Sequence, residues 1–134
     1  MTETAIGPTT DTGWEVAGRF LDALVRRDFD ALLECLDPQV RFRALLPPGL
    51  VEMETAIAAV GRFRLWFEGK HPFEVVDASV GQVGDRLYLR WRVRSHRADD
   101  PTTICLVEQH AFASVTDRIV ALDLLCSGFR PEES

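Results

Sequence analysis

The sequence predicts an α+β fold in which three N-terminal helices pack on one face of a strongly bent, mainly antiparallel sheet. Apolar residues recur at helical spacing in three segments before about residue 67, and they alternate with polar residues at strand spacing after about residue 73. Helices followed by a run of strands are typical of this class. The length of 134 residues fits one domain with a full core. We expect a flexible tail over 1–12, one domain over 13–130 and a second tail over 131–134.

The helices are predicted from apolar periodicity and from their end signals. Asp28 can cap the second helix, and Gly69 follows the third helix, where glycine commonly ends a helix. A half-buried strand is expected between these two helices, around Val40 to Ala44, and Pro47-Pro48 breaks it. The three helices are expected over about 12–27, 29–36 and 52–67.

The second half predicts four strands joined by short turns, over about 73–83, 86–94, 103–115 and 118–127. Gly84-Asp85 is a two-residue turn signal between the first two. On the strand after it, Leu87, Leu89, Trp91 and Val93 share one face and four arginines share the other. We expect the arginines to face outward and to pair with acids on neighbouring strands or across a dimer; they are Arg86, Arg90, Arg92 and Arg94.

Composition excludes several classes of protein. With 46% hydrophobic residues and a net charge of −6, the chain is neither disordered nor a dedicated nucleic-acid binder. No uninterrupted apolar run is long enough to span a membrane, and the N-terminus lacks a secretory signal. The three cysteines are scattered in apolar stretches, which argues against disulfides and zinc. We expect a cytoplasmic protein with no metal and no cofactor, and the 14 arginines against one lysine fit a GC-rich bacterial genome.

Glu108 is the sharpest functional signal. Strand periodicity places Ile104, Leu106, Glu108, His110 and Phe112 on one face, and because three of these are large and apolar we expect that face to point inward. A carboxylate in such a place is costly unless it is paired or lines a wet cavity, and burial suits it to general acid–base work. Glu108 and His110 are therefore the predicted catalytic residues. The alternative is a structural acid paired with an arginine or a histidine.

Apolar and aromatic residues on the inward phases predict a pocket for a small apolar molecule. An ordinary core is the alternative interpretation of the same residues. The predicted lining consists of Phe20, Leu24, Phe42, Phe63, Trp66, Trp91, Phe112, Leu124 and Cys126.

A homodimer through the outer sheet face is also predicted. Apolar residues fall on the expected outward phases of the last two strands, and a monomer would expose them to water. They are Cys105, Val107, Ala111, Ile119, Ala121 and Leu125. We expect no nucleic-acid or membrane partner.

Three stretches carry a resemblance to the nuclear transport factor two (NTF2)-like superfamily. They are Val25 to Leu33, Asp37 to Phe42, and Val107 to Phe112 followed by Asp117 to Val120. The resemblance implies a cone-shaped fold with a pocket between helices and sheet. This superfamily includes isomerases, cyclases, hydrolases, dehydratases and binding proteins, so the resemblance alone does not choose an activity.

Within that superfamily, the chain departs from ketosteroid isomerases and resembles SnoaL-like cyclases. The tyrosine and aspartate of the isomerases fall on Phe20 and Ala44, which cannot donate or accept a proton. The cyclase pattern of an acid, three residues and a phenylalanine is matched by Glu108 and Phe112, with His96 near the position of a further histidine. Sites of the limonene-epoxide-hydrolase type need an inward acid on the last strand, where Asp123 is expected to face outward.

Two functions follow as hypotheses. The first is a cofactor-free isomerase, cyclase or dehydratase that moves a proton on an apolar oxygenated metabolite. The second is a non-catalytic ligand-binding or dimerisation module on the same fold, which the absent tyrosine and aspartate favour.

Overall fold

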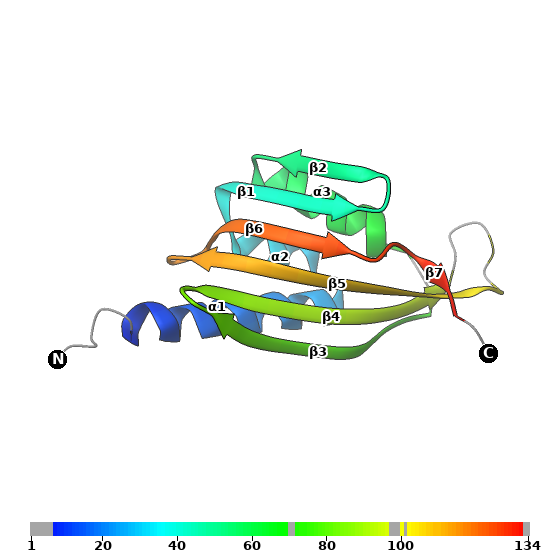
Figure 1. Cartoon of the computed structure of the whole chain (residues 1–134), viewed down its shortest axis with the longest axis horizontal. Coiled ribbons are helices and arrows are strands. Elements are labelled where there is room, and N and C mark those ends of the chain that lie inside the picture. Colours follow the sequence, from blue (N-terminus) through cyan, green and yellow to red (C-terminus); the bar gives the residue numbers. More distant parts are fainter. Residues whose placement is uncertain (1–6, 70–71, 97–99, 101, 133–134) are drawn as a thin grey trace.

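The computed structural model describes residues 7–69, 72–96, 100 and 102–132. Its helices are α1 (Gly7–Arg26), α2 (Phe29–Glu34) and α3 (Ala56–Phe67). Its strands are β1 (Leu36–Leu46), β2 (Gly49–Met53), β3 (Phe73–Val83), β4 (Arg86–His96), β5 (Ile104–Val115), β6 (Ile119–Cys126) and β7 (Arg130–Pro131). The helices lie together on one side of the sheet (Figure 1). No helix within these residues is both long and apolar enough to cross a bilayer.

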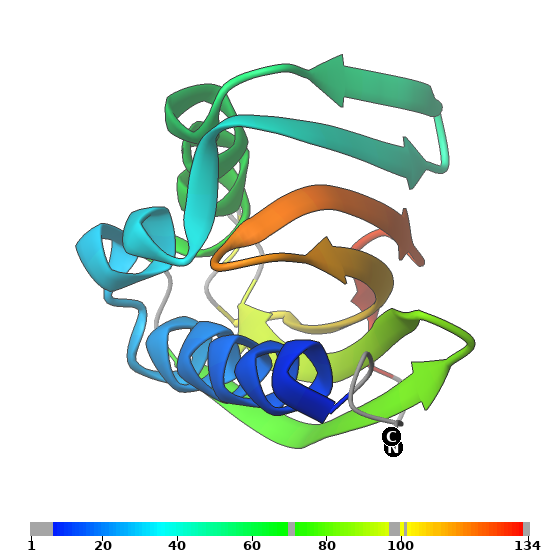
Figure 2. The same cartoon turned by 90° about the vertical axis from the view of Figure 1, so that its left-hand side faces the viewer.

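The strands form one curved sheet in the order β2-β1-β6-β5-β4-β3, and β7 pairs with β5. All pairings are antiparallel except that of β1 with β6, which brings the first strand beside the last long one. The sheet bends around the helices, so its inner face is covered and its outer face is not (Figure 2). The predicted α+β class is confirmed.

Side-chain caps begin the two shorter helices. The Asp28 carboxylate accepts a hydrogen bond from the Ala31 backbone N–H at 3.1 Å, as the sequence predicts for α2. Thr55 does the same for Ala58 at the start of α3. Arg27 links α1 to α2 with a φ of 52°, and its guanidinium donates to the Phe67 carbonyl at the end of α3. These contacts join the ends of all three helices.

Three predicted boundaries differ from the structure. Helix α1 begins at Gly7, inside the stretch predicted as a tail over 1–12, of which residues 1–6 lie outside the described part of the chain. Residues Glu52 and Met53, predicted as the start of the third helix, belong to β2 instead. Pro47-Pro48 reverses the chain in a tight hairpin, so the next segment pairs with β1 before the Thr55 cap starts α3. Pro131, predicted as tail, pairs with Cys105 through β7, and 133–134 lie outside the described residues.

The core between helices and sheet is an aromatic cluster centred on Phe63 of α3. Its ring lies 5.3–6.5 Å, centroid to centroid, from five other rings. These distances are typical of packed aromatic pairs. The five neighbours come from α1, β1, α3 and β4, and they are Phe20, Phe42, Trp66, Phe67 and Trp91.

The inward face of β5 is the opposite of the predicted one. Cys105, Val107, Gln109, Ala111 and Ala113 are buried against the core, and the alternate residues, Glu108 and His110 among them, face outward. The register with β4 explains the difference, because Gln109 pairs with Trp91 and Ala111 with Leu89. Trp91 and Leu89 already fill the interior at this level, so β5 presents smaller residues beside them.

Replacing Phe63 tests the aromatic cluster. We expect Phe63→Ala to lower the free energy of unfolding by about 3–5 kcal/mol, because it opens a cavity at the centre of the core. Ile57→Ala is the matched control, since Ile57 lies on the same helix and is 77% exposed, and it should change stability by less than about 0.5 kcal/mol. Urea unfolding followed by tryptophan fluorescence measures both. Equal losses in the two variants would contradict the assignment of the core.

Candidate proton-transfer site

Three side chains form a hydrogen-bonded chain on the outer sheet face. His110 Nε2 lies 2.6 Å from Glu108 Oε2, and His110 Nδ1 lies 2.5 Å from the Tyr88 hydroxyl. Glu108 and His110 lie two residues apart on β5, so strand geometry puts them on one face. Tyr88 reaches them from β4, where its neighbours pair with β5 in register. We call Glu108, His110 and Tyr88 the relay.

Arg92 holds the carboxylate end of the relay. Its Nε and Nη2 both donate to Glu108 Oε1, at 3.1 and 2.9 Å, which leaves Oε2 for His110. The hydrogen bond from His110 and those from Arg92 lower the pKa of Glu108. Glu108 is therefore an ionised acceptor at neutral pH, and its position is set by two partners.

The relay borders an apolar groove on the outer face. The groove has a volume of about 580 Å³, within the usual range for small-molecule sites. Leu45, Val83 and Leu125, at 50%, 59% and 53% exposure, form its open sides. It is lined by Leu45, Val83, Tyr88, His110, Phe112, Asp123, Leu124 and Leu125.

Asp123 at the edge of this groove joins three arginines. Its carboxylate lies 2.7 Å from Arg86, 2.9 Å from Arg43 and 3.6 Å from Arg41. Burial raises the pKa of Asp123, but hydrogen bonds from Arg43 and Arg86 outweigh it, so the pKa lies below its usual value. The outward position predicted for Asp123 is confirmed, because this cluster lies on the outer face.

The prediction that the outward arginine row of β4 pairs with acids on neighbouring strands is confirmed. Arg90 pairs with Asp77 of β3 and lowers the pKa of that acid, and Arg94 pairs with Glu132 and Glu74. With Arg86 and Arg92 already paired, all four arginines of the row have an acid on a neighbouring segment. The row is a set of cross-strand ion pairs.

The inner face carries a different polar group. Trp91 Nε1 donates to Gln109 Oε1 at 2.6 Å, and Gln109 Nε2 lies 3.3 Å from Cys126 Sγ. Gln109 is fully buried, and its carbonyl and amide both have partners. This arrangement satisfies buried polar atoms and holds no ionisable acid or base other than the thiol. Sequence reasoning missed Gln109 because it placed the other face of β5 inward.

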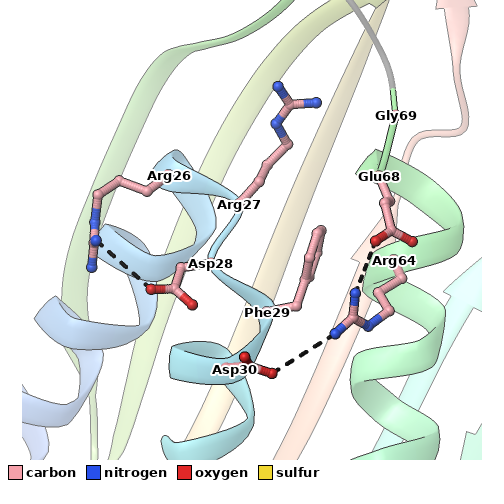
Figure 3. Close-up of a pocket in the computed structure, with 8 residues that line it drawn as sticks. All are labelled: Arg26, Arg27, Asp28, Phe29, Asp30, Arg64, Glu68 and Gly69. Atoms are coloured by element: carbon pink, nitrogen blue, oxygen red, sulfur yellow. Dashed lines mark hydrogen bonds and ion pairs between the residues drawn. The ribbon is translucent and has the colours of Figure 1, made fainter.

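A second, polar pocket of about 510 Å³ lies where the ends of α1, α2 and α3 meet (Figure 3). Its charged groups pair with one another: Arg26 with Asp28 at 3.8 Å, and Arg64 with Asp30 and Glu68 at 3.9 and 2.9 Å. These pairs are consistent with a role in joining the helices.

The predicted site residues divide between the two faces. Glu108, His110 and Phe112 lie outside, so the prediction that they face a pocket inside the cone is wrong, while their mutual proximity is confirmed. The others are buried, and most of them contact one another as core residues do, while Leu124 also borders the outer groove. Their role in ligand binding stays a prediction. They are Phe20, Leu24, Phe42, Phe63, Trp66, Trp91, Leu124 and Cys126.

Most of the apolar residues predicted to form a dimer surface do not lie on the outer face. Cys105, Val107, Ala111, Ile119 and Ala121 are buried inside the protomer, and only Leu125 of that set is largely exposed. The exposed apolar area of the outer face lies instead around the groove.

Tyr88 is the member of the site that the sequence did not assign. It is the only tyrosine of the chain, and the β4–β5 register places it diagonally across from His110. The alternation along β4 places Tyr88 on its outward face, but the sequence does not give the pairing register between β4 and β5. Within the described residues, no group of three or more His, Cys, Asp or Glu side chains could hold a metal ion.

Comparison with known proteins gives the family. The model of the SnoaL-like domain matches residues 17–121, so this chain belongs to the SnoaL-like domain family. Its fold is that of the NTF2-like superfamily. No curated protein sequence matches the chain.

Solved structures share the fold at low identity. An epoxide hydrolase of the LEH-like type from M. tuberculosis superposes with a TM-score of 0.66 and 18% identity, covering 90% of this chain and 85% of that one. A proposed polyketide cyclase from Xanthomonas campestris superposes with a TM-score of 0.69 and 18% identity, over 86% of this chain and 90% of that one. IdmH, a proposed polyketide cyclase from Streptomyces antibioticus, superposes with a TM-score of 0.68 and 16% identity, over 85% of this chain and 91% of that one. These likenesses concern the fold.

Replacing Asp123 tests the electrostatics of the outer face. Asp123→Asn should lower the free energy of unfolding by about 1–3 kcal/mol at neutral pH, because charged hydrogen bonds to Arg43 and Arg86 are lost. Because the folded-state pKa is depressed, this stabilisation is present above the unfolded pKa of about 3.9 and is lost as pH falls through the folded pKa. The difference in the free energy of unfolding between wild type and variant should therefore disappear at acidic pH. Urea unfolding at several pH values measures this difference, with Glu15→Gln, at an exposed position of α1, as the control. A difference independent of pH would contradict the assignment.

Proposed function

We propose that this chain is a cofactor-free small-molecule enzyme of the SnoaL-like type, an isomerase, cyclase or dehydratase that moves a proton on an apolar oxygenated metabolite. The single observation that carries the proposal is the contact between Glu108 and His110, at 2.6 Å, beside an apolar groove. A histidine oriented by an ionised carboxylate is a common proton-transfer unit.

The roles follow from the hydrogen bonds. Glu108, ionised and held by Arg92, orients His110 and stabilises its protonated form. His110 exchanges the proton, and the apolar walls of the groove exclude water from a substrate. Epoxide hydrolase and proposed cyclase activities on the same fold are compatible with this chemistry.

A second candidate function is a non-catalytic ligand-binding or dimerisation module. The observation that favours it is the exposure of Leu45, Val83 and Leu125 on one face, while the interior is filled by aromatic rings. A second copy of the chain on the outer sheet face would cover these side chains. In that case the relay would lie within or beside the interface.

Glu108→Gln distinguishes the two functions. Native mass spectrometry of the purified protein identifies any metabolite that co-purifies with it. A panel of apolar carbonyl compounds is then incubated with the protein in heavy water, and NMR detects a substrate by the exchange of one of its protons for deuterium. The variant should then lose about 10²-fold or more in turnover, because the carboxylate that orients His110 is gone. Glu132→Gln is the matched control, since Glu132 also pairs with an outer-face arginine but lies outside the groove lining, and it should keep the wild-type rate.

Full turnover by Glu108→Gln would refute the proton-transfer role. Bound metabolite without turnover, together with a dimer in sedimentation, would favour the second function. A monomer at micromolar concentration would contradict the predicted dimer.

A further inference from the structure

The positions of the protons in the relay are determined by the chemistry of its members. An ionised carboxylate offers only acceptors, so His110 Nε2 must carry the proton that it shares with Glu108. A neutral imidazole then has a lone pair on Nδ1, and the Tyr88 hydroxyl must donate to it. Tyr88 therefore uses its only proton inside the relay.

The consequence concerns what Tyr88 can offer to a ligand. With its proton directed to His110, the Tyr88 oxygen presents free lone pairs, and Tyr88 itself lines the groove. It can accept a hydrogen bond from a ligand but has none to give. The relay at rest is therefore built to receive a proton from a ligand.

We propose that Tyr88 is the residue that contacts the substrate, and that the groove binds an apolar ring compound through an acidic hydroxyl, a phenol or an enol, whose proton the relay accepts. This inference rests on the proposed function for its site, and it extends it by naming the contacting residue and the ligand class. Phe112 and Leu125 provide apolar surface for the ring, and Asp123 lies among arginines at the edge.

The proton transfer is balanced within the site. The ligand O–H bond breaks as an O–H bond forms on Tyr88, while the former Tyr88 proton moves to His110 Nδ1. The products are a ligand oxyanion and an imidazolium that remains hydrogen-bonded to Glu108. No other reactant is needed, and reversal returns the proton to the ligand at the same or another atom.

Charged neighbours on each packed strand favour the products. Beside the relay on β4, Arg86 and Arg90 bring positive charge to the face on which the oxyanion would form, and β6 places the apolar Leu125 opposite His110. The acids on this face are already paired with arginines. The charged groups that face the relay and groove are Arg86, Arg90 and Arg92 of β4, Glu108 of β5, Asp123 of β6, Arg41 and Arg43 of β1, and Asp77 of β3, which pairs with Arg90.

Para-nitrophenol is the probe, because its ionised form absorbs visible light and reports proton loss directly. Titrated with intact wild-type protein below its solution pKa, it should bind and become ionised to an extent roughly tenfold greater than when free, the effect expected of an opposite charge within about 4–6 Å. Nitrobenzene, which lacks the hydroxyl, should bind more weakly. Tyr88→Phe keeps the ring and should bind nitrophenol without this gain in ionisation.

A further variant within the relay and a control outside it complete the test. His110→Asn should abolish the gain, because the proton has no acceptor, while Glu132→Gln should keep it. Lack of nitrophenol binding by the wild type, or equal ionisation in wild type and Tyr88→Phe, would overturn the proposal. A dimer that excludes nitrophenol would assign the groove to an interface and would also overturn it.

The result is independent of turnover. Ionisation of nitrophenol that requires Tyr88 would support the ligand class even if no reaction were found. Conversely, turnover that depends on Glu108 but not on Tyr88 would preserve the proposed function and refute this extension.

Discussion

The rest of the structure depends on the packing of Trp91 at the centre of the sheet. Its ring is fully buried, contacts Phe20 and Phe63 from the helices, and donates a hydrogen bond to Gln109 on the next strand. Because register partners in an antiparallel pair point to the same face, this placement determines which residues of β5 meet the core. With Phe20 and Phe63 packed on this ring, the inward positions of β5 beside it hold smaller side chains, Gln109 and Ala111.

That constraint places the ionisable groups on the outer face. Glu108, His110 and Tyr88 come together there because β4 and β5 each contribute the side chains that the core does not use. Water near this face lowers the cost of holding charges, and cross-strand arginines neutralise the acids. An apolar groove beside such a network is unusual for a surface that serves only solubility.

The two proposed functions compete for the same surface. Leu45, Val83 and Leu125 are the side chains that a substrate or a second protomer would cover, and Tyr88 and His110 border the same groove. Family membership does not decide between them, because one fold supports many activities. The proposed arrangement, in which the Tyr88 hydroxyl donates to a neutral His110, makes Tyr88 an acceptor toward whatever enters the groove.

The sequence by itself determined the periodicities, the class of fold, the Asp28 cap, the arginine row and the grouping of Glu108 with His110 on one face. It also placed Leu89 and Trp91 inward correctly. Only the tertiary structure decided that the face of β5 bearing Glu108 points outward, that Glu52 lies in a strand, and that Tyr88 completes the relay. The physical reason is that a period of two shows which side chains share a face, whereas the volume left by neighbouring strands and helices decides which face is buried.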